Sequence, residues 1–200
     1  GDEVVCLQRR PAVFLGHQNA REVLADIRDA KAVTLAAQGC DAIIHGAARV
    51  GVVGSQKDFH DTNVRGTENI IQAAEQHNLS RLVFVSTPSV AHTGDSLIGA
   101  SAGEAEIGRS RSHYAESKAI AERLVLNARN DHLAVVAIRP HLVWGPGDTQ
   151  LVDRIVDRAA SGRLAVIGTG NALVDSTYID NAVSGHIAAL DALHIGSACD

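Results

Sequence analysis

The sequence predicts an α/β fold, a doubly wound parallel sheet with helices on both of its faces. Short apolar segments rich in β-branched residues alternate along the chain with longer segments of helical periodicity. The short segments are almost continuously apolar, which is typical of strands buried on both faces. Strands that alternate with helices need crossover connections, and these make neighbouring strands parallel. With 46% hydrophobic residues among 200, the chain can bury a core of this kind.

Five strands and three helices are expected. The strands are residues 4–7, 13–15, 42–45, 82–86 and 133–138, and the helices are residues 30–38, 55–77 and 113–130. Residues 94–111, rich in Gly, Ser and Ala, are expected to form a long loop, and such loops are often functional. The alternation weakens after Gly145-Pro-Gly147, so we expect one domain over residues 1–147 and part of a smaller lobe over residues 148–200.

The composition argues against several classes of partner. A net charge of −5 gives the whole chain no attraction to nucleic acid or to an anionic membrane, and 3% aromatic residues are too few for base-stacking surfaces. No apolar run approaches the roughly 20 residues of a membrane span. The three cysteines lie far apart and show no metal-site spacing, which is typical of reduced thiols. We expect a cytoplasmic protein that binds no metal.

The two ends of the chain suggest an internal fragment. The chain opens on Gly-Asp-Glu-Val-Val-Cys-Leu, which looks like a strand already under way, and it contains no methionine. It ends shortly after a helical stretch. We therefore expect the domain to be truncated at both ends.

The pentapeptide Tyr114-Ala-Glu-Ser-Lys118 is the main chemical signal. On a helix, positions i and i+4 share one face, so the Lys118 ammonium can approach the Tyr114 phenol. A free phenol has a pKa of about 10, and a nearby positive charge lowers it. The spacing therefore predicts a lowered pKa and a general acid–base.

A hydroxyl is expected opposite this tyrosine. The strand at residues 82–86 runs into Thr87-Pro-Ser89, and Pro88 helps to fix the turn. A hydroxyl there can donate to a substrate oxygen on which negative charge develops, as carbonyl reduction requires. Thr87 is the leading candidate, and Ser86 and Ser89 compete with it.

Seven motifs occur in the order found in the extended short-chain dehydrogenase/reductases, and the resemblance covers essentially the whole chain. They are Asp26-Ile-Arg-Asp29, His45-Gly-Ala-Ala48, Asn63-Val-Arg-Gly-Thr67, Val85-Ser-Thr-Pro-Ser-Val90, Tyr114-Ala-Glu-Ser-Lys118, Arg139-Pro-His-Leu-Val-Trp-Gly-Pro-Gly147 and Tyr178-Ile-Asp-Asn181. Residues 139–151, 172–175 and 178–186 resemble the 3β-hydroxysteroid dehydrogenase branch, which includes sterol-4α-carboxylate 3-dehydrogenases and 2-alkyl-3-oxoalkanoate reductases. The resemblance implies a partial NAD(P)-binding Rossmann-like domain over residues 1–147 and a partial substrate-binding lobe over residues 148–200.

The resemblance also implies a role for each matching position. Tyr114 is the acid–base, Lys118 holds the nicotinamide ribose, Thr87 supplies the hydroxyl, and Asn63 supports the site. The positions implied to contact the cofactor are Gln8, Arg9, Arg10, Asp26, Ile27, Ala47, Ala48, Ser86, Tyr114, Lys118, Pro140 and Val143. The candidates for substrate contact are Ser89, His141 and Trp144, with a structural role as the alternative for His141 and a packed loop aromatic as the alternative for Trp144. Asp26 has an equally good alternative, in which it caps the segment after it.

The expected cofactor is NADP(H), with NAD(H) as the alternative. In dinucleotide sites an acidic residue at the end of the second strand binds the ribose 2′-hydroxyl, whereas an arginine accommodates a 2′-phosphate. The corresponding strand end here is Gln8-Arg9-Arg10, without a carboxylate. The plain alternative is a solvated loop.

The motifs favour an oxidoreductase that acts on a small hydrophobic substrate, a 3β-hydroxysteroid or a 3-hydroxy or 3-oxo acid. Related sugar-nucleotide dehydratases carry an Asp-Glu pair after the threonine, where this chain has Pro88-Ser89, and epimerases continue with Val-Tyr-Gly, where it has Val90-Ala-His92. A substrate carboxylate could be held by Arg139, by His141 or by a residue of the missing part of the substrate lobe. A sugar-nucleotide epimerase and a catalytically silent dinucleotide-binding protein are the alternatives. Relatives often form homodimers through the Tyr–Lys helix and its neighbour.

One family feature is missing. The first strand and the Gly-rich turn, which hold the pyrophosphate at a helix N-terminus, should precede Gly1. We therefore expect that this polypeptide alone neither folds stably nor binds a dinucleotide well.

Overall fold

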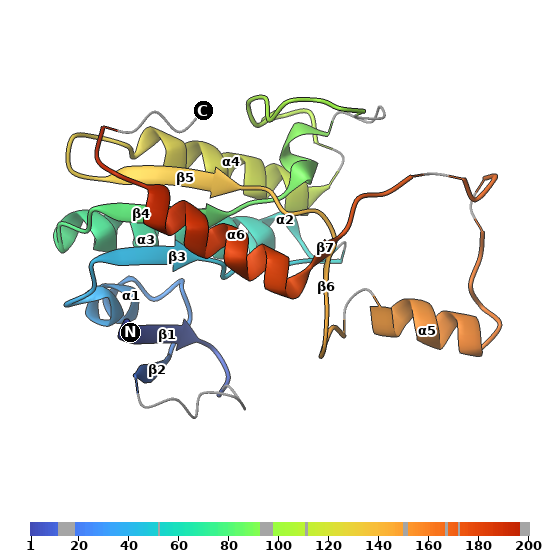
Figure 1. Ribbon diagram of the computed structural model, residues 1–200, viewed down its shortest axis with the longest axis horizontal. Coiled ribbons are helices and arrows are strands. Elements are labelled where there is room, and N and C mark those ends of the chain that lie inside the picture. Colours follow the sequence, from blue (N-terminus) through green and yellow to red (C-terminus); the bar gives the residue numbers. More distant parts are fainter. Residues whose placement is uncertain are drawn as a thin grey trace.

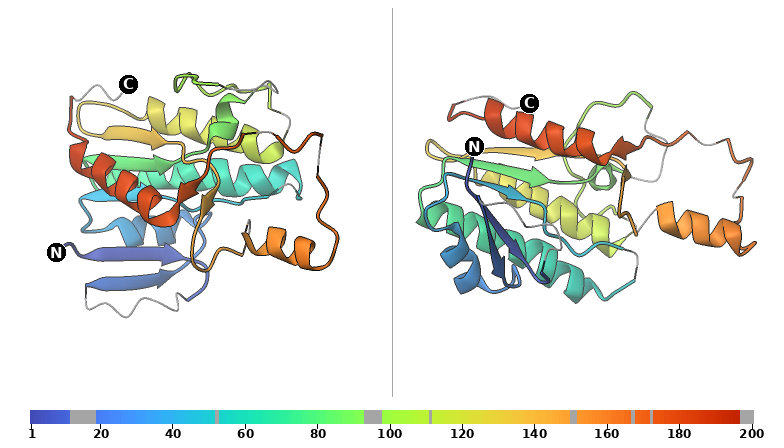
Figure 2. Two further views of the ribbon diagram at one scale, coloured as in Figure 1. Left: turned by 45° about the vertical axis from the view of Figure 1, so that its right-hand side comes forward. Right: turned by 60° about the horizontal axis from the view of Figure 1, so that its bottom comes forward.

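A parallel sheet lies at the centre of the computed structural model (Figure 1). The structure describes residues 1–11, 19–51, 53–92, 98–110, 112–149, 152–166, 168–171 and 173–196. The central strands are β3 (Ala42–His45), β4 (Arg81–Val85) and β5 (Ala134–Ile138), all parallel and in the order β3-β4-β5. Helices cover both faces, and Figure 2 shows α6 on one side of the sheet and α3 and α4 on the other. The predicted doubly wound α/β fold is confirmed.

A second parallel pair of strands lies beside α1 (Ala30–Ala37). It consists of β1 (Val4–Gln8), which was predicted, and β2 (Ala20–Leu24), which was not. The sequence Ala-Arg-Glu-Val-Leu of β2 carries two adjacent charges, and its side chains are half-buried or exposed, so it lacks the continuous apolar pattern of a central strand. The strand predicted at residues 13–15 lies outside the described residues.

The helix predicted over residues 55–77 changes its winding in the middle. It consists of α2 (Gln56–Phe59), a π-helical segment η1 (His60–Arg65) and α3 (Gly66–Gln76). A capping box between Ser55 and Asp58 starts it, as the residue types favour. Segments of π-helix are often found at functional sites, and η1 contains the buried Asn63.

The main core lies between the sheet and helices α1, α3 and α4 (His113–Asn127), the last of which was predicted over residues 113–130. Its buried residues are Ile27, Val33, Ala37, Ile70, Ala73, Ala74, Leu79, Leu82, Phe84, Ala121, Val125, Leu133 and Val135. A smaller cluster of Val83, Ala134 and Leu193 lies on the other face of the sheet. The central strands are therefore buried on both sides, as their apolar sequences predict.

The chain after residue 147 has two unlike parts. Helix α5 (Val152–Ala160) lies apart from the sheet and buries none of its residues (Figure 1, orange). Helix α6 (Ile179–Ala192) returns to the sheet, and Arg81 Nη1 donates to the carbonyl of Leu190 at 3.3 Å. The short strands β6 (Val143–Trp144) and β7 (Thr177–Tyr178) pair in parallel at the base of this excursion. The domain boundary at residue 147 stays a prediction.

Within the described residues, no helix is both long and apolar enough to cross a lipid bilayer. The described part of the predicted loop, residues 98–110, contains neither helix nor strand.

Candidate active site

Tyr114 and Thr87 meet where the first turn of α4 passes the end of β4. The Ser112 side chain caps α4, and Tyr114 follows in its first turn. The 3-10 turn η2 (Pro88–Ala91) begins directly after β4, and its N-cap is Thr87, whose Oγ1 accepts from the Ser89 backbone N–H at 3.3 Å. The Thr87 side chain lies close enough to the Tyr114 phenol to lower its pKa. The predicted hydroxyl and phenol therefore lie near one another.

Burial raises the pKa of the Tyr114 phenol above its usual value, and the nearby Thr87 side chain opposes this only in part. The expectation of a pKa lowered by Lys118 is wrong for this structure. The Lys118 ammonium instead donates to the backbone carbonyl of Val85 at 2.7 Å and lies 3.9 Å from the centre of the Phe84 ring. The i, i+4 spacing puts both residues on one helix face, but the long lysine side chain reaches an acceptor on β4.

The pKa of the Lys118 ammonium is also shifted. Lys118 is only 3% exposed, and this burial lowers the pKa to about 8, although the negative charge of Glu122 counteracts the shift. A buried ammonium at the edge of a site is a common mark of function.

Asn63 connects three elements of the site. Its Oδ1 accepts from the Arg49 N–H at 2.7 Å, and its Nδ2 donates to the Arg49 carbonyl at 3.0 Å and to Ser117 Oγ at 2.9 Å. Ser117 Oγ donates in turn to the Tyr114 carbonyl at 2.8 Å. One buried amide therefore fixes the loop after β3 and the first turn of α4 against η1.

His45 supports the π-helical segment η1 through a hydrogen bond with Thr67. This role was not predicted from the sequence. Thr67 Oγ1 donates its single proton to the Asn63 carbonyl at 2.6 Å, so it accepts from His45 Nε2, which lies 2.9 Å away. Burial, together with the charge of Lys118, lowers the pKa of the His45 imidazole to about 3. The ring is therefore neutral and carries its proton on Nε2.

The predicted cofactor residues follow the ends of several strands. Ala47 is exposed, and Ala48 is half-buried, in the loop after β3. If the preceding Gly46 carried a Cβ, the nearest atom among the described residues would be a Val85 methyl carbon, 3.6 Å away. Pro140 and Val143 follow β5, so three parallel strands end at one edge together with Thr87. In open α/β sheets this edge is where ligands bind.

Two predicted cofactor residues near β1 and β2, Gln8 and Asp26, already have hydrogen-bond partners within the chain. Gln8 Nε2 donates to the carboxylate of Glu22 on β2, so a carboxylate does lie beside this strand end, whereas Arg9 and Arg10 are exposed. Asp26 Oδ2 accepts from Arg28 Nη2 at 2.8 Å, and this contact holds the pKa of Asp26 below its usual value.

Two further details concern the segment after β2. The N-cap of α1 is Asp29, whereas Asp26 Oδ1 accepts from the Arg28 backbone N–H at 2.9 Å and so caps the turn that follows it, as the alternative predicts. The side chain of Ile27 is buried in the core against Gly66, where an added Cβ would lie 2.5 Å from Ile27 Cδ1. The Ile27 carbonyl accepts from Asn69 Nδ2 at 2.8 Å, so the residue packs within the core.

Comparison with protein families identifies the chain. The model of the 3-beta hydroxysteroid dehydrogenase/isomerase family matches residues 8–197. The chain belongs to this family. The predicted resemblance to the 3β-hydroxysteroid dehydrogenase branch is thereby confirmed.

Curated members of the family are similar over most of the chain. A 2-alkyl-3-oxoalkanoate reductase from Stenotrophomonas maltophilia (strain K279a) is 43% identical over 201 residues, covering 100% of this chain and 61% of the relative. A 3beta-hydroxysteroid-dehydrogenase/decarboxylase isoform 2 from Arabidopsis thaliana is 33% identical over 203 residues, covering 93% of this chain and 36% of the relative. The chain thus spans less than two thirds of the length of these relatives.

Solved structures share the fold. A double mutant of the dTDP-glucose 4,6-dehydratase DesIV from Streptomyces venezuelae, with NAD bound, has a TM-score of 0.80 and 29% identity, and the match covers 94% of this chain and 62% of DesIV. MoeE5 in complex with UDP-glucose and NAD has a TM-score of 0.76 and 27% identity, over 93% and 62% of the two chains. The Rossmann-like architecture expected of the family is therefore confirmed.

A buried ion pair in this family member was missed at the sequence level. Glu122 accepts a hydrogen bond from Ser86 Oγ and pairs with Arg139, whose Nε lies 2.9 Å from Glu122 Oε2. Ser86 therefore turns its hydroxyl toward Glu122, and Arg139 is not free to hold a substrate carboxylate. The available signal was the i+4 spacing of Glu122 from Lys118 on the same helix face.

The predicted substrate residues occupy two places. Ser89 lies beside Thr87 in η2, and its Oγ accepts from Thr87 Oγ1 at 3.2 Å. His141, which is half-buried, and Trp144, which is 40% exposed, lie after β5, where Leu142 adopts a left-handed φ of 38°. The Trp144 ring packs edge-on against Tyr178 of β7, with 5.2 Å between ring centres. Trp144 is thus at least partly a packing residue.

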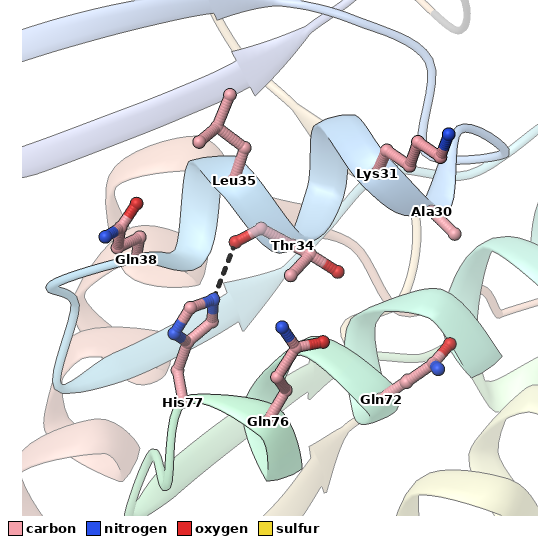
Figure 3. A pocket seen from close by; sticks show the side chains of 8 residues that line it. All are labelled: Ala30, Lys31, Thr34, Leu35, Gln38, Gln72, Gln76 and His77. Carbon is pink, nitrogen blue, oxygen red and sulfur yellow. Dashed lines mark hydrogen bonds between the residues drawn. The ribbon is translucent and has the colours of Figure 1, made fainter.

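Two observations concern other sites. Among the described residues, no group of three or more His, Cys, Asp and Glu side chains could hold a metal ion. An open groove of about 590 Å³ lies between α1 and α3 (Figure 3), and His77 Nε2 donates across it to the Thr34 carbonyl at 2.9 Å. Its lining residues are Ala30, Lys31, Thr34, Leu35, Gln38, Gln72, Gln76 and His77, and none of them belongs to the candidate active site.

Proposed function

We propose that the protein is an NAD(P)-dependent oxidoreductase that interconverts a secondary alcohol and a ketone on a hydrophobic substrate. The observation that carries the proposal is the placement of Thr87 near Tyr114, at the sheet edge where Asn63 and Lys118 converge. In this assignment Tyr114 moves the proton, Thr87 binds the substrate oxygen, Lys118 holds the nicotinamide ribose, and Asn63 supports the site.

The chain offers groups that suit a nicotinamide dinucleotide. Gly46, Ala47 and Ala48 are small, so a flat ligand can approach the backbone after β3. Lys118 supplies a cation at the end of β4, and Pro140 and Val143 flank the same edge. When bound, the cofactor would supply or accept the hydride at the substrate carbon.

Residues of the chain transfer the proton. Because burial raises the pKa of Tyr114, its phenol is protonated near neutral pH and can donate to a ketone oxygen during reduction. The Thr87 hydroxyl can turn its proton from Ser89 Oγ to the same oxygen and donate a second hydrogen bond as negative charge develops. Oxidation of the alcohol requires the reverse transfer, to the deprotonated phenol.

NADP(H) is the proposed cofactor, because the exposed Arg9 and Arg10 follow β1 and can accommodate a 2′-phosphate. The NAD-bound neighbours and the Glu22 carboxylate beside Gln8 favour NAD(H) as the alternative. In the full-length protein, Gln8→Asp should shift the ratio of the two catalytic efficiencies toward NAD(H). An unchanged ratio would contradict the proposed role of this strand end.

The proposed substrates are 3-hydroxy or 3-oxo acids and 3β-hydroxysteroids, which the names of the curated relatives support. Since Arg139 is paired with Glu122, His141 remains the described candidate for holding a substrate carboxylate. A sugar-nucleotide epimerase is the second candidate, because the structural neighbours bind sugar nucleotides. The set of Tyr114, Lys118 and Thr87 argues against a catalytically silent protein.

The test measures NADPH absorbance with the full-length protein and three substrate classes. Loss of absorbance with 3-oxo acids or 3-ketosteroids supports the proposal, and turnover with UDP-sugars alone would contradict it. Homodimer formation through α4 and a neighbouring helix, and a cytoplasmic location, remain predictions from the sequence.

A further inference from the structure

A buried ion pair joins α4 to the ends of two strands, one helical turn beyond Lys118. Glu122 is fully buried, and its Oε2 accepts from both Ser86 Oγ and Arg139 Nε. Its Oε1 accepts from Arg139 Nη2, so the carboxylate and guanidinium form a two-point contact. The Arg139 side chain is only 15% exposed. Both oxygens of Glu122 are therefore satisfied, by the residues that directly follow β4 and β5.

Stability alone is a weak reason for such a pair. Removing two charges from water costs about as much free energy as their attraction returns, so apolar side chains of similar volume often serve a core equally well. Removing one partner, however, leaves a buried charge unpaired and is strongly destabilising. The reason for the pair should therefore be sought in the geometry that it fixes.

The pair fixes the two strand ends that lead into the candidate active site. Ser86 immediately precedes Thr87, and Arg139 immediately precedes Pro140. Tyr114, Lys118 and Glu122 follow one another at intervals of four residues on α4, so they lie on one face of the helix. Through this face, one carboxylate sets the positions of Thr87 and of the segment after β5 relative to Tyr114.

We propose that Glu122 is a positioning residue of the active site, acting on Thr87 through Ser86 and on the segment that begins at Pro140 through Arg139. This role rests on the proposed reductase function. Glu122 does not touch the reacting atoms in this assignment; it holds the groups that do. A displacement of about 1 Å at such groups can cost on the order of a hundredfold in rate.

The test uses the full-length protein with NADPH and the 3-oxo acid that it reduces best. Glu122→Gln and Arg139→Met should each lower kcat by about a hundredfold, while KM for both the ketone and NADPH stays within about threefold. The kcat of the double variant should be no lower than that of the less active single variant, because the two residues act as one unit. Glu75→Gln, at an exposed glutamate on α3, should retain the wild-type kcat.

Ser86→Ala keeps the proposal testable if the charge variants do not fold. It removes one hydroxyl but leaves the ion pair intact, and it should lower kcat about fivefold with KM unchanged. Circular dichroism and the melting temperature establish which variants are folded.

Three outcomes would overturn the positioning role while the wild type is active. They are a folded Glu122→Gln with the wild-type kcat, an Arg139→Met in which KM for the acid rises while kcat is unchanged, and a Ser86→Ala in which only KM for NADPH rises. The second assigns Arg139 to substrate binding, and the third assigns Ser86 to the cofactor. A wild type that reduces none of the ketones overturns the proposed function as well, and so identifies that failure separately.

Discussion

Helices α4 and α5 both have one apolar face, but they have opposite surroundings. In α5, Val152, Ile155 and Val156 share a face at i, i+3 and i+4 spacing, and all are exposed. Helix α4 has the less regular pattern, yet it buries seven residues, which include the polar Ser117, Lys118 and Glu122. An amphipathic pattern therefore indicates that a helix can bury one face, and tertiary contacts decide whether it does.

The polar residues buried along α4 carry more information than its apolar ones. A polar group without a partner costs free energy when buried, and each of these three has one. Ser117 bonds to Asn63, Lys118 to the Val85 carbonyl, and Glu122 to Arg139. The charged residues of α5, by contrast, are all exposed, and this difference supports the proposal that α4 carries the active site.

The largest expected effect comes from Tyr114→Phe in the full-length protein. The variant keeps the ring and its edge-on packing against Phe59 but removes the proton donor. We expect kcat to fall about a thousandfold in the NADPH assay, with little change in melting temperature. A loss in kcat below about tenfold would show that another group transfers the proton, and that α4 does not carry the acid–base residue.

Acidification should destabilise the buried layer next to α4. An unfolded histidine takes up a proton near pH 6.5, whereas the folded His45 stays neutral until about pH 3. The unfolded state therefore binds more protons in this window, and the free energy of unfolding should fall by about 1.4 kcal/mol per pH unit as the pH decreases from 6.5. Urea unfolding between pH 7 and pH 5 measures this slope. His45→Gln should reduce it, and equal slopes would contradict the assignment.

Val125→Ala tests the buried face of α4 by deleting two methyl groups. Val125 is fully buried in the main core, so the variant leaves a cavity, and the free energy of unfolding should fall by about 2 kcal/mol. Urea unfolding gives this value directly. A change below about 0.5 kcal/mol would mean that the core around α4 relaxes fully.

Val156→Ala makes the same deletion on α5, and it should have the smallest effect. Val156 is 57% exposed, so the expected change in the free energy of unfolding is below about 0.5 kcal/mol. A loss as large as that of Val125→Ala in the full-length protein would show that another part of that protein covers α5. The two valines together therefore measure how different the two helices are.

The sequence predicted those elements whose signals are local. The strand at residues 42–45 has the predicted bounds, and α4 begins at the predicted residue, since a serine cap and an apolar run need no distant partner. The strand β2 was missed because a charged, half-exposed strand lacks the apolar run that marks a central one. The π-helical winding of η1 was also missed. Its Asn63 carbonyl accepts from Thr67, whose own partner His45 lies 22 residues away from Thr67.

Some features of the candidate site could likewise be predicted from local sequence, and others could not. The residue types and the spacing of Tyr114 and Lys118 could be predicted from the chain, as could a hydroxyl at the end of β4. The chain favoured Thr87 but left Ser86 and Ser89 as competitors. The structure shows that Ser86 turns its hydroxyl toward Glu122, whereas Ser89 lies beside Thr87. Arg139 was considered for substrate binding because its buried partner, 17 residues away, could not be identified from the sequence.

The sequence by itself determined the alternation of strands and helices and the helical spacing of the acid–base pair, because both follow from local periodicity. Only the tertiary structure decided which charges are paired, that Lys118 reaches Val85 and not the phenol, and that burial raises the pKa of Tyr114. The physical reason is that hydrogen bonding and desolvation depend on atoms brought together from distant parts of the chain. Periodicity fixes which residues share a face, and packing fixes what that face meets.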